Sequence, residues 1–335
     1  MCAILAFIGC IFSLKCFSFL DVGYNHGRSN NLDGLRYVLA SLVVFHHMDY
    51  FGNYFENRDC YGSSLYINYL GRIGVAAFFM ITAFLFWGKV RKVDNVDWVG
   101  LYKDRLFRIV PLALFVSAVA VVIILYLTNF PKVNKIVVPD LLSWFDGGLF
   151  DRKPDLNGMA GSRIVIAGVT WTLRWEWFFY FSLPALFFFR KRGLEMSITL
   201  FMASCFLLKD YSNSYYLWCY FSAGIMAKEL AERINISKIK VNLSFCFIAT
   251  LFYLSEPVPN TEVFAVYMAT FFILILKGFD LFGVLSSKGF VRLGHLSYSI
   301  YLNQGLLLFC TFTFLDRNII VKHEQLVLSL MFALL

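Results

Sequence analysis

The strongest constraint on this chain is a series of apolar runs long enough to cross a lipid bilayer. A membrane-spanning helix needs about 20 mostly apolar residues. Of the 335 residues, 59% are apolar and only 16% are charged, against about 45–50% and about 25% in soluble domains. One soluble core cannot bury so much apolar surface, which excludes a soluble enzyme, a disordered protein and a disulfide-stapled secreted domain. The sequence therefore predicts an all-α fold, a polytopic helical bundle in a membrane.

The apolar runs predict about ten transmembrane helices. We expect them at residues 34–54, 66–88, 106–128, 169–189, 195–208, 211–230, 241–255, 262–276, 293–315 and 325–335. Residues 1–30 form an apolar N-terminal segment that precedes a transmembrane domain over 31–335. The run 1–20 within it is either an extra span or the result of a start site placed too early.

The distribution of basic residues predicts the orientation of the bundle. If residues 21–33 are cytoplasmic and the sides alternate, 18 of the 30 Lys and Arg residues fall on the cytoplasmic side and 9 on the other. Basic residues gather in cytoplasmic loops, so the net charge of +8 needs no nucleic-acid partner. The segment 129–168 then lies outside, where Trp144, Asp146 and Asp155 could hold an extracytoplasmic ligand.

Ionisable residues inside spans are costly and mark functional sites. In the first span, Arg36 and His47 are eleven residues apart, so they face the same way to within about 20° and lie about 16 Å apart along the helix. His46 points about 80° away from Arg36, and the small residue Ala40 shares the stripe of His47. The alternative is that both histidines cap the outer end of the span while Arg36 reaches to the surface.

Two more groups of polar residues stand out. Arg105 and Arg108 share a helix face near the cytoplasm, which suits a phosphate-rich ligand, although a plain cytoplasmic anchor has the same pattern. Glu176 shares a face with Thr172 and Tyr180, about 10 Å from the outer end of its span. We expect Glu176 and His47 at similar depth, as an acid–base pair. An ion pair that only holds helices together is the alternative for Glu176.

The ninth span begins with a polar stretch, and its role stays open between a site and hydrogen bonding among helices. This stretch contains Ser297, Tyr298, Ser299, Tyr301, Asn303 and Gln304. None of the 8 cysteines forms a CxxC pair, and no P-loop, GxGxxG, HExxH or GxSxG motif occurs. The sequence therefore predicts no metal site and gives no support to phosphoryl transfer or soluble-hydrolase chemistry.

Five segments of the chain resemble, in order, the acyltransferase family 3 membrane proteins. They are LDGLRYVLASLVVFHH, GRIGVAAFFMITAFLF, DRLFRIVP, TWTLRWEWFFYFSLP and LGHLSYSIYL. Members of this bacterial family have about ten spans and O-acylate surface polysaccharides such as O-antigen and exopolysaccharide. The resemblance covers roughly residues 31–335.

The resemblance implies roles for five residues. Arg36 and His47 match the family's pattern of Arg, ten residues and His, which selects His47 over its neighbour. Arg105 and Arg108 match the RxxR element implicated in acyl-CoA use, and Glu176 matches the Glu of the Trp-Ser-Leu-x-x-Glu segment. His47 and Glu176 are thus the expected catalytic residues, and the three arginines are expected to bind the donor.

The sequence departs from the family at two places. Gln304 stands where many members have His, which removes a titratable group. Arg174 and Trp175 stand where small residues are usual, which changes the expected acceptor pocket.

The resemblance implies an O-acetyltransferase in the bacterial inner (plasma) membrane. Acetyl-CoA would be the cytoplasmic donor, and the acceptor would be a hydroxyl of a cell-surface polysaccharide or lipid-linked glycan on the extracytoplasmic side. The alternative is a transporter or flippase of a lipid-linked glycan that uses the same buried charges as a substrate pathway. No inverted repeat is visible in the sequence, which disfavours transport.

Overall fold

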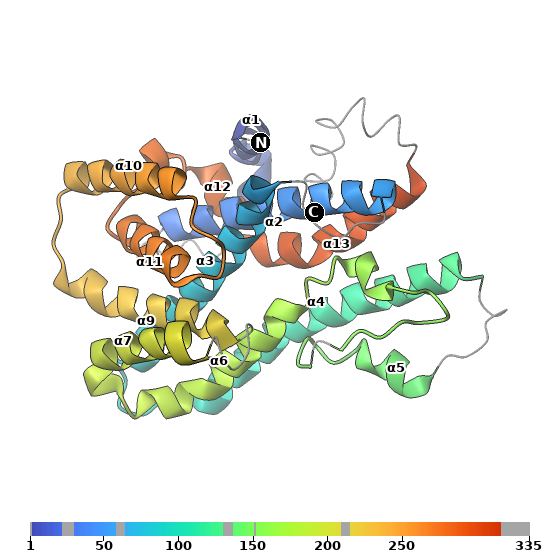
Figure 1. Cartoon of the computed structure of the whole chain (residues 1–335), viewed down its shortest axis with the longest axis horizontal. Coiled ribbons are helices and arrows are strands. Elements are labelled where there is room, and N and C mark those ends of the chain that lie inside the picture. The colour runs from blue at the N-terminus through green and yellow to red at the C-terminus, as the bar shows by residue number, and fades with distance from the viewer. Residues whose placement is uncertain are drawn as a thin grey trace.

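A computed structural model describes residues 2–21, 30–57, 64–129, 137–150, 152–208 and 215–315. The described residues are all-α, as predicted, and contain no β-sheet (Figure 1). The α-helices are α1 (Cys2–Phe12), α2 (Asn30–Asn57), α3 (Leu65–Val90), α4 (Trp98–Leu127), α5 (Val138–Ser143), α6 (Trp171–Phe187), α7 (Gly193–Ala203), α9 (Trp218–Arg233), α10 (Lys238–Ser255), α11 (Glu262–Leu276), α12 (Lys288–His295) and α13 (Ser297–Phe314). Two 3₁₀ segments also matter, η1 (Lys15–Asp21) and η2 (Ser162–Ile166).

Fewer helices than expected are membrane spans by length and hydropathy. Within the described residues these are α3, α4 and α10, or four spans if α1 and η1, bent by 87°, count as one. The prediction of ten spans is therefore not confirmed, and the run 325–335 lies outside the described residues. Several other predicted spans do form helices, but α6, α9 and α11 have only 17, 16 and 15 residues. Others, such as α2, carry polar residues.

Close contacts between helix backbones bring α2, α3 and α9 together. A Cβ atom at Gly74 would lie 3.0 Å from the carbonyl oxygen of Leu39, and one at Gly224 would lie 2.3 Å from that of Met80. Side chains larger than hydrogen would force these helices apart, and small residues at crossings are the usual solution in membranes. The central helix α3 thereby holds α2 on one side and α9 on the other.

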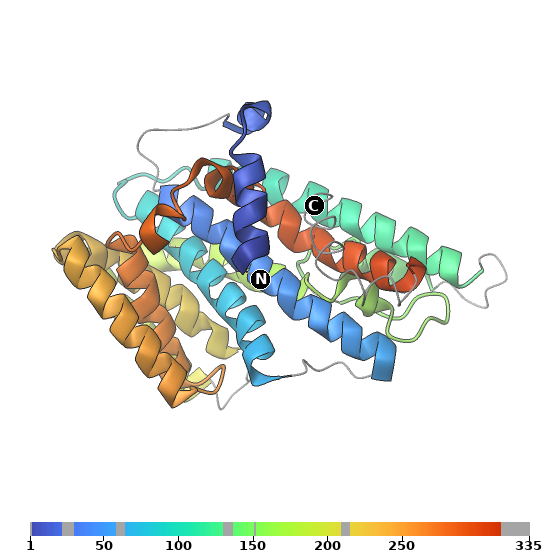
Figure 2. The same ribbon diagram turned by 90° about the horizontal axis from the view of Figure 1, so that it is seen from above.

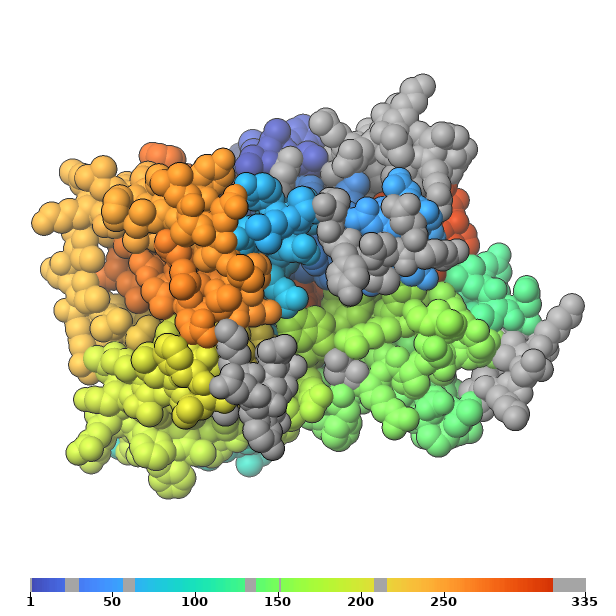
Figure 3. All heavy atoms as spheres, viewed as in Figure 1, coloured from blue at the N-terminus to red at the C-terminus, as the bar shows by residue number. Residues whose placement is uncertain are grey.

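Between α4 and α6, the described residues 137–150 and 152–170 include η2, which packs against α4, and Figure 3 shows these residues in green as part of the body of the protein. The backbone of this segment is satisfied by its own side chains, because Asp146 accepts hydrogen bonds from the amides of Gly148 and Phe150. Asp146 also pairs at 2.7 Å with Lys153, whose side chain is 1% exposed. Irregular backbone is tolerated beside transmembrane helices only when its polar groups are satisfied in this way. The carboxylate of Asp146, expected to be open to a ligand, is thus used within the segment.

The N-terminal segment is part of the folded body. Seen from above, α1 crosses α2 (Figure 2), and both pack with α12 around the buried Phe290. Arg292 on α12 is 4% exposed and binds Asp21 through two hydrogen bonds of 2.7 Å. It also donates to the carbonyl oxygens of Phe12 and Leu14, at the bend between α1 and η1. One guanidinium therefore fixes the turn of the segment against α12.

A buried ion pair joins the end of α3 to α9. Glu229 is 5% exposed, accepts a hydrogen bond of 2.8 Å from the indole of Trp87, and pairs with Arg91 at 2.5 Å. Arg91 also pairs with Glu232, whose side chain is 41% exposed. A buried charge that loses its partner is costly, so this cluster fixes the two helices relative to one another.

We expect Glu229→Ala to lower the free energy of unfolding by about 3–5 kcal/mol, because Arg91 and the indole of Trp87 lose a buried partner. Glu229→Gln keeps an acceptor for Trp87 and should cost less. The matched control Glu232→Ala removes an exposed partner, worth about 1 kcal/mol or less. Thermal unfolding of the purified proteins in detergent ranks the three variants by stability. Equal losses of stability for Glu229→Ala and Glu232→Ala would contradict the prediction.

Candidate functional site

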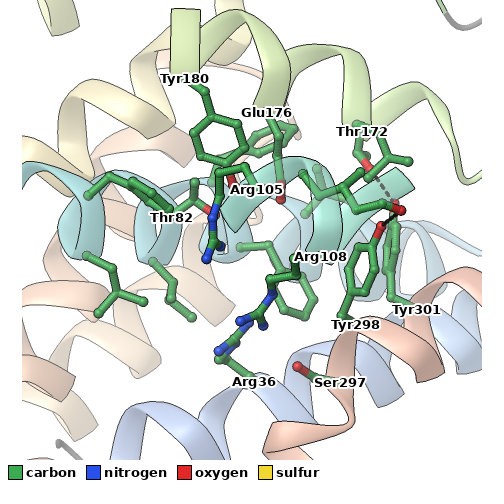
Figure 4. Close-up of a pocket in the computed structure, with 18 of the residues that line it drawn as sticks. Arg36, Thr82, Arg105, Arg108, Thr172, Glu176, Tyr180, Ser297, Tyr298 and Tyr301 are labelled. Carbon is green, nitrogen blue, oxygen red and sulfur yellow. Dashed lines mark hydrogen bonds between the residues drawn. The ribbon is translucent and has the colours of Figure 1, made fainter. Parts of the chain in front are cut away.

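A cavity of about 440 Å³ lies between α2, α3, α4, α6 and α13. Figure 4 shows its labelled polar side chains converging from α2, α3, α4, α6 and α13. Its basic residues are Arg36, Lys89, Arg105 and Arg108. The hydroxyl groups around it belong to Thr82, Thr172, Tyr180, Ser297, Tyr298 and Tyr301. Glu176 is its one carboxylate, so the cavity carries a net positive charge.

The three arginines predicted to act together do share this cavity. Asp97 caps the first turn of α4 by accepting a hydrogen bond of 2.8 Å from the amide of Gly100. The helix starts there, and Arg105 and Arg108 follow on its inner side. Arg105 lies over the ring of Phe86 at 4.9 Å, while the side chain of Arg108 is exposed. The basic part of the cavity is therefore reachable from outside the protein.

Arg36 reaches the same cavity from α2. Its guanidinium lies 3.8 Å from Asp33, one turn earlier on the helix. Asp33 is held where α12 crosses α2, because a Cβ atom at Gly294 would lie 1.8 Å from its carbonyl oxygen. The crossing of α2 and α12 thus sets the position of the first arginine.

Glu176 faces the arginines across the cavity. Its carboxylate accepts a hydrogen bond of 3.1 Å from the hydroxyl of Tyr180, one turn later on α6. The charges of Arg108, Arg36 and Arg105 all act on this carboxylate. The site therefore combines several guanidinium groups with one carboxylate in a largely apolar enclosure, where charges interact more strongly than in water.

Glu176 lines this cavity and His47 does not, so the expected acid–base pair of the two stays a prediction. The start of α6 is packed inside the body, where Thr172 lies 3.0 Å from the hydroxyl of Tyr301 and the indole of Trp177 donates to the carbonyl oxygen of Gly147.

His47 lies outside the cavity, on the side of α2 that faces α13. The neighbouring His46 is turned toward α3, where its Nδ1 lies 3.1 Å from the carbonyl oxygen of Ile67. The Nδ1 atom of His47 is buried without a hydrogen-bond partner, and the amide of Gln304 is the α13 side chain that interacts with its ring. The two histidines thus face different helices.

Phe78 on α3 and Tyr301 on α13 both line the cavity, with ring centroids 5.9 Å apart. The Tyr301 hydroxyl also lies 3.3 Å from the carbonyl oxygen of Val169, which holds the ring in place. Gln304 lies one turn, about 4.5 Å, farther along α13 than Tyr301. The turn of α13 that carries Gln304 is therefore next to the part of the cavity that these two rings line.

Sequence reasoning did not assign Lys89, Tyr298 or Tyr301 to the site of the arginines. The polar start of the ninth span was the available signal for the tyrosines, and it left a purely structural role open. Tyr298 donates to the carbonyl oxygen of Ile109. Both tyrosines thus bind backbone and line the cavity at once. In the described part of the chain, no group of three His, Cys, Asp or Glu side chains could hold a metal ion.

Comparison with known proteins identifies one family. Residues 29–335 match the model of the family Acyl_transf_3, described as an acyltransferase domain. The match confirms the resemblance seen in the five sequence segments. Comparison with curated proteins and with solved structures finds no match.

We expect Glu176→Gln to strengthen the binding of a polyanion to the cavity. The substitution keeps the shape of the side chain and removes the one negative charge among the basic groups. A unit charge about 10 Å away contributes on the order of 1 kcal/mol, or about fivefold in affinity. Calorimetric titration with pyrophosphate at low salt measures the change. Glu232→Gln, which lies outside the cavity lining, is the control, and unchanged or weaker binding by Glu176→Gln would contradict the electrostatic reading.

Proposed function

The chain belongs to acyltransferase family 3, and we propose that it is a membrane O-acetyltransferase. It would transfer an acetyl group from acetyl-CoA to a hydroxyl of a cell-surface polysaccharide or a lipid-linked glycan. The family makes the chain a membrane acyltransferase, whereas the donor and the acceptor are part of the proposal. The observation that carries it is the convergence of Arg36, Arg105 and Arg108 on one cavity.

The basic part of the cavity suits the phosphates of CoA. Guanidinium groups bind phosphate through paired hydrogen bonds, and Arg105 and Arg108 present two such groups from successive turns of α4. Lys89 and Arg108 are exposed, which gives the nucleotide a way in. Beyond the arginines the lining includes Val75, Phe78 and Ile81, which suits the thin, largely apolar pantetheine arm.

The aromatic part of the cavity suits a short acyl group. Phe78 and Tyr301 line it with ring centroids 5.9 Å apart, and in this account the acyl end of the donor lies beside these rings, within reach of His47. Arg36 and His47 are about 16 Å apart along α2, a length that an extended pantetheine arm can cover. A thioester bound in this way would arrive next to the aromatic pair, with little room for a long chain.

His47 would act as the general base. Its imidazole takes the proton of the acceptor hydroxyl while the hydroxyl oxygen attacks the thioester carbonyl. The new ester bond forms as the carbon–sulfur bond breaks, and the CoA sulfur leaves and takes up the proton from the imidazolium. Glu176 accepts a hydrogen bond from Tyr180 and is acted on by the charges of the three arginines, so in this account it orders the guanidinium groups.

The topology and location also belong to the proposal. The bias of basic residues supports a cytoplasmic donor side. The acceptor would then be a glycan on the extracytoplasmic side of the bacterial inner membrane. Transfer of radiolabelled acetyl from acetyl-CoA to glycan, in membranes with and without the protein, tests the reaction itself. No transfer above the background of membranes without the protein would overturn it.

Arg105→Ala and Arg108→Ala should weaken the use of acetyl-CoA more than that of the acceptor. Each removes a charge-assisted hydrogen bond worth about 1.5–3 kcal/mol, or roughly 10–150-fold in the apparent KM for the donor. Arg174→Ala is the matched control, because Arg174 is an exposed α6 residue whose guanidinium lies over the ring of Phe178. If the transfer rate depends on acetyl-CoA concentration in the same way in both variants as in the wild type, the two arginines serve only as a cytoplasmic anchor.

His47→Ala should abolish transfer, while His46→Ala should keep much of it. A general base contributes about 10²–10⁴-fold, so the loss is measurable in crude membranes. The two residues are adjacent and differ in the helix they face, which makes each the control for the other. Both proteins must accumulate to the same level. Full activity of His47→Ala, or loss only in His46→Ala, would contradict the assignment of the base.

A further inference from the structure

Gln304 is a buried polar side chain without a hydrogen-bond partner. It is 0% exposed, and neither its amide nitrogen nor its amide oxygen has a hydrogen-bond partner in the described residues. The adjacent Asn303 differs, because its amide donates a hydrogen bond of 3.1 Å to the carbonyl oxygen of Ser299 within α13. Buried amides are almost always satisfied, so the exception at Gln304 calls for a functional explanation.

The position of Gln304 is fixed by its neighbour. Gly305 packs directly on the segment before α6, and a Cβ atom there would lie 2.3 Å from the carbonyl carbon of Ile166. This contact holds the turn of α13 that carries Gln304 against the rest of the bundle. The side chain is therefore presented to α2 by rigid backbone and can adjust chiefly through rotation of its terminal amide.

The imidazole of His47 is the group that Gln304 meets. The Nδ1 atom of His47 is buried and lacks a partner, like the amide. The His47 residue as a whole is partly exposed. Nδ1 of His47 and the Gln304 amide are therefore two buried, unsatisfied polar groups where α2 packs against α13.

We propose that Gln304 is the positioning residue of His47. Its amide oxygen accepts the proton on Nδ1, which fixes the tautomer in which Nε2 carries the lone pair. Histidine bases are commonly oriented by a hydrogen bond at the nitrogen that does not react. The inference rests on the proposed function of His47 as a general base.

The surroundings of His47 define the pH dependence. On α2, His46 and Tyr50 lie next to the ring, at centroid distances of 5.2 and 6.3 Å. Arg72 on α3 acts on His46, as does Asp49 on α2. From α13 the ring meets the uncharged Gln304. A carboxylate at position 304 would therefore be a new charge beside Nδ1 and would favour the imidazolium form of His47.

The test compares three variants in the acetyl-transfer assay. Gln304→Met keeps the size of the side chain and removes its hydrogen bonds, so kcat should fall by roughly 10–10³-fold while the KM for acetyl-CoA changes little. Gln304→Glu should move the acidic limb of the pH–rate profile upward by about one pH unit or more. Asn303→Met is the matched control and should stay near wild type. A kcat within threefold of wild type for folded Gln304→Met, or an unshifted limb for Gln304→Glu, would overturn the inference.

A second readout needs no turnover. Nitrogen NMR of protein labelled with ¹⁵N-histidine reports which ring nitrogen carries the proton, and His47→Ala identifies the signal by its loss. We expect His47 protonated on Nδ1 in the wild type and a mixture of tautomers in Gln304→Met. The same tautomer mixture in both proteins would overturn the inference. If instead the wild type shows no acetyl transfer, the proposed function fails, and the NMR result still decides whether Gln304 orients His47.

Discussion

The site depends on several guanidinium groups and one carboxylate gathered in a low-dielectric enclosure. Arg36, Arg105 and Arg108 come from two helices whose ends are anchored outside the cavity, by the crossing of α2 with α12 and by the Asp97 cap of α4. Isolated buried charges would be costly. The helices must therefore pack so that the arginines and the carboxylate lie close to one another. The irregular segment before α6 follows from the same need, because it lets Glu176 sit opposite the arginines.

The sequence predicted those features that depend on local spacing. Arg36 and His47 are eleven positions apart, a spacing that separates the direction of His47 from that of His46, and the structure turns His46 toward α3 and His47 toward α13. The pairing of Arg105 and Arg108 in one site is likewise a property of one helix. These predictions needed no knowledge of how distant segments pack.

Features that depend on tertiary packing could not be predicted from the sequence. The surroundings of Glu176 could not be predicted, because apolar runs do not show how a helix packs, and the first turn of α6 lies beside Tyr301. Ten spans were expected from composition, yet polar faces and short helices leave fewer that are apolar enough. The proposed partner of His47 was equally hidden, since Gln304 is about 250 residues away in the sequence and lies on α13, which packs against α2.

The account predicts one path from the arginines toward His47, along Phe78 and Tyr301, with the thioester end of the donor within reach of the base. Cryo-electron microscopy of the protein with CoA tests this most directly. The account predicts phosphates in contact with Arg36, Arg105 and Arg108 and the thiol end of CoA pointing toward the aromatic pair. CoA bound outside this cavity, or bound with its thiol end pointing away from His47, would contradict it.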